Sequence, residues 1–108
     1  MALKVKRNLT LIGGLPIEQN SVISIKFESI EREDKFEIKL SVWSSIENYN
    51  DKSKPKLADP VVEIEKYSWI KDLTENDFSS LSPLAVHQLV IEEIESWDAS
   101  WINKLEII

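Results

Sequence analysis

The clearest pattern in the chain is an alternation of apolar and polar residues in two segments near its middle. Apolar side chains occupy every second position of residues 23–27 and of residues 36–42, with charged or hydroxyl side chains between them. Period two is the spacing of a β-strand with one buried face, because successive side chains point to opposite sides of a sheet. The short charged link at 31–34 predicts a hairpin between the two strands, with its tip in water.

Two further segments show weaker strand patterns. In residues 3–11 the odd positions are mostly apolar, which predicts one strand that ends at a Gly-Gly-Leu-Pro turn at 13–16. This turn lacks the Lys-Ser or Lys-Thr pair of a phosphate-binding loop. Residues 61–70 also alternate, but the apolar positions shift by one halfway along. We interpret the shift as a β-bulge near Lys66 in a single strand.

The C-terminal part carries the signals of an amphipathic helix. Ser82 can cap the free N–H groups of a first turn, and Pro83 suits the first helical position. An apolar stripe follows at helical spacing, which predicts a helix that packs on the sheet. The stripe consists of Val86, Val90, Ile94, Trp97 and, if the helix continues that far, Trp101. The tail at 104–108 leaves a short final strand open, because Asn103 and Lys104 interrupt its pattern.

A polar segment at 44–60 separates the two groups of strands. It shows neither the period of a strand nor that of a helix. Such a long irregular segment is uncommon in a compact domain and is often functional. We therefore predict a long loop, which Tyr49 and Leu57 tether to the domain.

The order of these segments predicts a single α+β domain that covers residues 1–108. A chain of this length has the usual size of one domain. Strands come first and one helix comes near the end, so we expect a mainly antiparallel sheet, or a sandwich-like meander, with one C-terminal amphipathic helix packed on it. The pattern does not distinguish this arrangement from a partly closed barrel under the helix.

Composition narrows the classes of function. Hydrophobic residues make up 43% of the chain, which is enough to offset the entropy of folding. The net charge of −6 disfavours nucleic acid as a partner, because such binding depends on lysine and arginine. The absence of cysteine excludes disulfides, zinc–thiolate sites and thiol catalysis, and is compatible with a reducing cytoplasm. We also expect no secretion signal and no membrane span, since no long apolar run occurs.

Candidate groups for catalysis are few. His87 is the only histidine and lies at the margin of the helical stripe, where we expect a packing or hydrogen-bonding role. Glu92, Glu93 and Glu95 point to different sides of the helix and are typical of a solvated surface. We therefore predict that the protein is not an enzyme and that it has no cofactor, metal or small-molecule substrate.

The chain has four tryptophans, more than so small a core easily encloses. Trp43 has the opposite parity to the apolar residues of 36–42, so its side chain should point away from the core. Either it faces a partner or a second layer, such as the long loop or the tail, covers it. Our candidate interface residues are Trp43, Tyr49, Lys52, Lys54, Lys56, Trp69 and Trp101.

The order of elements also suggests a family. The chain starts with Met-Ala-Leu-Lys, and a strand, Gly-Gly-Leu-Pro, the hairpin ISIKFESIEREDKFEIKLSVWSS, a Ser-Pro helix and a short tail follow. In this layout and size, over most of its length, it resembles small virion structural proteins of tailed bacteriophages, from the neck, tail or baseplate. The resemblance implies a non-enzymatic component of the virion, assembled in the host cytoplasm. It further implies many copies in a symmetric ring, with other protein subunits as partners.

A second hypothesis belongs to another class. The chain could be a small cytoplasmic protein-binding module, a regulator or an inhibitor, that acts through its acidic surface and exposed tryptophans. The virion hypothesis predicts stable high-order association and a 44–60 loop that is ordered only in the assembly. The second hypothesis predicts a monomer or dimer that captures one host protein.

Overall fold

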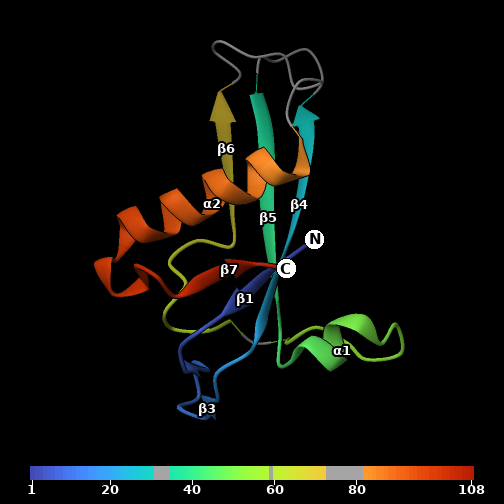
Figure 1. Ribbon diagram of the computed structural model, residues 1–108, viewed down its shortest axis with the longest axis vertical. Helices are drawn as coiled ribbons and strands as arrows, with labels where there is room; N and C mark the ends of the chain where they lie inside the picture. Colours follow the sequence, from blue (N-terminus) through green and yellow to red (C-terminus); the bar gives the residue numbers. More distant parts are fainter. Residues whose placement is uncertain (31–34, 59, 73–81) are drawn as a thin grey trace.

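A computed structural model describes residues 1–30, 35–58, 60–72 and 82–108 (Figure 1). It confirms the predicted α+β class: a five-stranded antiparallel sheet carries a C-terminal helix, with a small two-stranded sheet beside it. The large sheet has the strand order β6-β5-β4-β1-β7. Its strands are β1 (Leu3–Val5), β4 (Val22–Ile30), β5 (Lys35–Trp43), β6 (Ser68–Asp72) and β7 (Leu105–Ile107). The remaining elements are β2 (Leu9–Thr10), β3 (Pro16–Ile17), α1 (Ile46–Asn50), α2 (Pro83–Trp97) and the 3-10 helix η2 (Ala99–Trp101).

The hairpin of β4 and β5 forms the centre of the sheet, as the alternation predicts. Ile23 lies opposite Val42, and Phe27 opposite Ile38. Because opposite residues in an antiparallel pair share a face, the apolar side chains of both strands gather on one side. The predicted tip at 31–34 lies outside the described residues.

Helix α2 covers the apolar face of this sheet and completes the core. In Figure 1 it crosses in front of β6, β5 and β4. Ser82 caps the helix as predicted, since its hydroxyl accepts from the amide of Ala85 at 3.1 Å. The stripe side chains Val86, Val90 and Ile94 are fully buried against the strands.

The two ends of the chain meet in the sheet. β7 pairs with β1, and Ala2 and Ile108 exchange backbone hydrogen bonds of 3.2 and 2.9 Å. The tail therefore forms a short strand, which the sequence alone did not decide. Asn103 takes a positive φ of 63° just before it, which asparagine tolerates better than most residues.

Two strand predictions were wrong in detail. Residues 3–11 form two strands in different sheets, because the polar Arg7 falls on the apolar parity and the chain turns there. Residues 61–70 contain no bulged single strand. Val61 bridges to Leu11 beside the small sheet, and only from Tyr67 onward does the chain pair with β5. The shift of parity marks this change of partner.

The 44–60 segment is more ordered than predicted. Its first part forms α1, a helix of five residues, which is too short to show a helical period in the sequence. Ser45 caps it by accepting from the amide of Asn48 at 3.1 Å. Tyr49 and Leu57 both contact the rest of the domain, as expected. The Tyr49 hydroxyl lies 3.5 Å from the carbonyl of Met1, and the Leu57 amide donates to the carbonyl of Val42 at 2.8 Å.

Candidate interaction surfaces

Trp43 lies on the sheet face opposite α2, as its parity predicts. Its indole donates to the hydroxyl of Ser24 at 3.0 Å. The ring of Tyr49, on α1, meets it edge to face at a centroid distance of 5.8 Å. Of the two alternatives for this residue, the structure shows the second layer: the 44–60 segment covers Trp43 in part and leaves it half-buried.

Trp69 faces the helix rather than the solvent. Its ring packs edge to face on Trp97 at a centroid distance of 5.0 Å, which joins β6 to the end of α2. The indole N–H of Trp69 is buried and has no acceptor within the described ranges. This residue therefore contributes to packing between helix and sheet, and little of it is available to a partner.

Trp101 is not a surface residue, so its prediction as an interface residue is wrong for the folded chain. It is 0% exposed, and its indole donates to the carbonyl of Glu63 at 3.0 Å. The helix ends at Trp97 instead of continuing. Asp98 accepts from the amide of Ser100 at 2.9 Å and starts η2, which turns Trp101 into the core.

The three lysines of the 44–60 segment are exposed. Lys52, Lys54 and Lys56 lie beyond α1, and no carboxylate of the described residues pairs with them. The turn that contains Lys52 is held by Asp51, which accepts from the hydroxyl and the amide of Ser53 at 2.7 and 2.9 Å. These two hydrogen bonds lower the pKa of Asp51.

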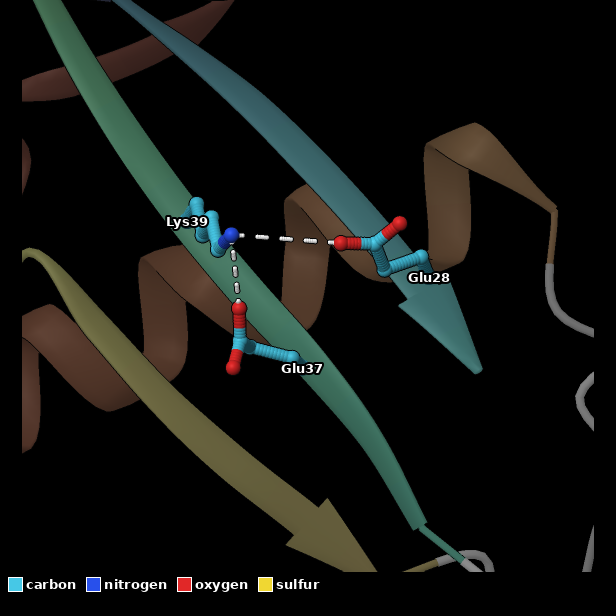
Figure 2. Close-up of polar contacts among 3 residues, drawn as sticks. All are labelled: Glu28, Glu37 and Lys39. Atoms are coloured by element: carbon cyan, nitrogen blue, oxygen red, sulfur yellow. Dashed lines mark ion pairs between the residues drawn. The ribbon is translucent and has the colours of Figure 1, made fainter. Parts of the chain in front are cut away.

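The outer face of the sheet carries a charged cluster. Figure 2 shows Lys39 on β5 between Glu37, 3.0 Å away on the same strand, and Glu28, 3.9 Å away on β4, with α2 behind the sheet. The hydrogen bond that Lys39 donates to the Glu37 carboxylate is the main reason that the pKa of Lys39 is raised. Ion pairs exposed to this degree contribute little to stability.

An apolar surface that our sequence analysis missed lies at the small sheet. The Ile12 amide donates to Pro60 at 3.3 Å, and the Val62 amide donates to Thr10 at 2.8 Å. This pairing places the side chains of Ile12 and Val62 on the same outward face, where they are 67% and 63% exposed. Leu15, in the same turn, is also exposed, but its carbonyl accepts from the amide of Leu11 at 2.9 Å, so it lies opposite Leu11 rather than beside Ile12. The sequence signal was the pair of apolar residues flanking the two glycines.

His87 is buried inside the domain. Its Nδ1 lies 2.6 Å from the carbonyl of Pro83, one helical turn earlier, and Nε2 has no partner among the described groups. The contact with a carbonyl requires a proton on Nδ1. Hydrogen bonding was the expected role. No group of three or more potential metal ligands occurs within the described ranges.

The described surface thus presents exposed apolar side chains at one end and ion-paired side chains on the outer face of the sheet. No described helix is long and apolar enough to cross a bilayer. No protein-family model, no curated protein and no solved structure matches the chain. Its function is therefore inferred from these surfaces and from the layout of its sequence.

Proposed function

We propose that the chain is a non-enzymatic structural component of a tailed bacteriophage particle and acts through contacts with other protein subunits. The layout of the sequence, from Met-Ala-Leu-Lys to the Ser-Pro helix and tail, supports the phage assignment by resemblance. The observation that carries the protein-contact part is the neighbouring pair of exposed apolar side chains, Ile12 and Val62.

This surface has the properties of a contact site. Single exposed apolar residues are common on proteins, but neighbouring ones are a mark of interaction surfaces. Ile12 and Val62 are diagonal neighbours on paired segments, because Val62 lies opposite Thr10 and the bridge joins Leu11 to Val61. Branched side chains held by a backbone ladder lose little further entropy on binding, which favours association.

The test combines localisation with a variant. We expect immunoblots to detect the chain in purified particles, and the wild-type chain to capture particle proteins in a pull-down. Val62→Asp should abolish that capture without lowering the melting temperature, since Val62 is exposed. Ile102→Asp is the matched control, because Ile102 is also exposed but belongs to the C-terminal segment after η2. Absence of the chain from purified particles would overturn the phage assignment.

One observation favours a second candidate, a small cytoplasmic regulatory or inhibitor module. The excess of acidic residues, 19 against 13 basic ones, would suit a basic surface on a single host protein. Light scattering after size exclusion separates the two functions: high-order association supports the particle component, and a one-to-one complex with a host protein supports the module. Rapid trypsin cleavage after Lys52 or Lys56 in the isolated chain would support an arm that becomes ordered only in an assembly.

A further inference from the structure

Strand β6 is an edge of the large sheet, and alternate backbone groups along it point away from β5. The amide of Leu40 donates to the carbonyl of Tyr67 at 2.8 Å, so these two residues face each other. Hydrogen bonding alternates along an antiparallel pair, so the backbone groups of Trp69 and Lys71 also point toward β5, and those of the residues between them point outward. The outward residues are Ser68, Ile70 and Asp72. Their outward groups have no backbone partner within the described residues.

The side chains leave this edge open to a further strand. Natural edge strands are usually protected by a projecting lysine, a proline or a bulge. The lysine of β6 is held elsewhere, because Lys71 pairs with Glu93 of α2 over the core side of the sheet. The middle of the edge instead carries Ile70, an apolar side chain that is 54% exposed.

We propose that two copies of the chain pair through β6, antiparallel and about a twofold axis that passes beside Ile70. The pairing joins two five-stranded sheets into one and leaves α2 of both copies on the same side. Isologous contacts of this kind are the most frequent in homo-oligomers. The inference deepens the protein-contact part of the proposed function, on which it rests, by naming a second copy as one partner.

In an antiparallel pair of two β6 strands, the side chains that face each other are compatible. With the axis at Ile70, the two Ile70 side chains face each other on the outer face of the sheet. Ser68 lies opposite Asp72 of the second copy, so a hydroxyl meets a carboxylate. On the core side, Trp69 lies opposite Lys71 of the second copy. No like charges are directly opposed in this register.

The other edge of the sheet is less suited to pairing. In β7, backbone hydrogen bonds join Ile108 to Ala2 and Lys104 to Lys6. Because hydrogen bonding alternates along an antiparallel pair, the backbone groups of Leu105 and Ile107 point away from β1. A twofold contact between these outward groups would place two Glu106 side chains opposite each other, which is destabilising.

Pairing of β6 with β7 of a second copy is also less favourable. The residues of β6 whose backbone groups point outward have side chains on the outer face, whereas Leu105 and Ile107 of β7 have theirs on the core face. An antiparallel pairing would set these residues directly opposite each other and turn one sheet over, so only a parallel pairing keeps both α2 helices on one side. In the parallel register that forms the most backbone hydrogen bonds between the copies, the side chain of Ile70 lies opposite that of Glu106. The contact of β6 with itself is therefore the better match.

A charge-swap experiment tests the axis directly. We expect the wild-type chain to give a concentration-dependent dimer mass by size exclusion with light scattering. Ile70→Lys and Ile70→Glu should each raise the dimer dissociation constant at least about tenfold, because like charges would face each other across the axis. An equimolar mixture of the two variants should restore the dimer. Ile102→Lys, at a similarly exposed residue outside β6, should dimerise as the wild type does.

Each outcome decides the proposal. A wild-type chain that stays monomeric overturns it, as does an Ile70→Lys variant that dimerises normally. Monomeric single variants whose mixture stays monomeric overturn the twofold register at Ile70. Unchanged melting temperatures show that the variants are folded. The test is separable from that of the proposed function, because a monomeric chain found in particles would overturn the dimer alone.

Discussion

The indole Nε1 of Trp101 donates a hydrogen bond of 3.0 Å to the main-chain oxygen of Glu63, 38 residues away in the sequence. The guanidinium of Arg7 lies over the same indole ring, 4.8 Å from its centroid. The carboxylate of Glu63 in turn accepts from the amide of Thr10 at 2.8 Å. One buried tryptophan thus connects the C-terminal tail, the irregular segment before β6 and the small sheet.

Trp101→Phe should destabilise the protein by about 1–3 kcal/mol, because it removes the N–H donor and leaves the Glu63 carbonyl without its partner. Urea denaturation followed by circular dichroism measures the loss. Trp43→Phe is the matched control: its indole donates to Ser24 at a half-buried site that water can reach. We expect the control to cost below about 1 kcal/mol. Equal losses for the two variants would contradict the central role of Trp101.

Glu63 should make the protein sensitive to acid. Burial raises the pKa of Glu63, but the hydrogen bonds from Thr10 and from its own amide, together with the charge of Arg7, outweigh burial, so that the pKa lies below its ordinary value. A carboxylate with a depressed pKa in the folded state stabilises that state above the pKa of the unfolded chain. The stabilisation is lost as the pH falls through the folded-state pKa, because the unfolded chain then binds the proton more readily.

The measurement compares Glu63→Gln with the wild type. At about pH 7 the variant should be the less stable, and the difference should shrink as the pH falls below about 4, near the ordinary pKa of glutamate. Glu65→Gln serves as the control, since Glu65 is an exposed carboxylate in the same segment. A difference for Glu63→Gln that stays constant across this range would show that the ionised carboxylate is not the stabilising group.

Ser82→Ala should cost about 1 kcal/mol of stability, because the first turn of α2 loses its hydroxyl acceptor. That turn contains no acidic side chain that could replace it. Thermal denaturation measures the effect, and Ser82→Asp should retain the stability of the wild type. Ser96→Ala changes the same residue type at an exposed position within the helix and should be nearly neutral. A loss with Ser96→Ala as large as with Ser82→Ala would argue against capping.

The elements that could be predicted have local signals. The alternation in β4 and β5 spans enough residues to fix their face, and the Ser82-Pro83 pair marks the start of α2 by capping chemistry alone. Segment 61–67 could not be predicted, because Val61 pairs with Leu11, far away in the sequence. Period and propensity contain no information on such partners.

The surfaces were harder to predict than the core. Trp101 was placed at a surface because four tryptophans exceeded the expected core, and the end of the helix at Asp98 depends on a hydrogen bond to Ser100. The exposed surface at Ile12 and Val62 depends on which two segments pair. Trp43 was predicted correctly to point away from the core, because parity in a regular strand decides it.

The two adjacent glycines of the β2–β3 turn should respond differently to substitution. The amide of Gly14 donates to the carbonyl of Leu11 at 2.8 Å, and Gly14 takes a φ of 91°. This conformation is unfavourable for residues with a Cβ, so Gly14→Ala should destabilise the protein by about 1–2 kcal/mol. Chemical denaturation of the purified variant measures the change.

Gly13→Ala is the control that isolates backbone conformation from packing. A Cβ at either glycine would meet no atom within 4 Å, so crowding cannot separate the two variants. Only Gly14 has a positive φ among the described glycines. Gly13→Ala should therefore be neutral or stabilise by up to about 1 kcal/mol through the unfolded chain. Gly14→Asn should fall between the two alanine variants, because asparagine tolerates the left-handed region. Equal effects at both positions would contradict the turn geometry between Ile12 and Leu15.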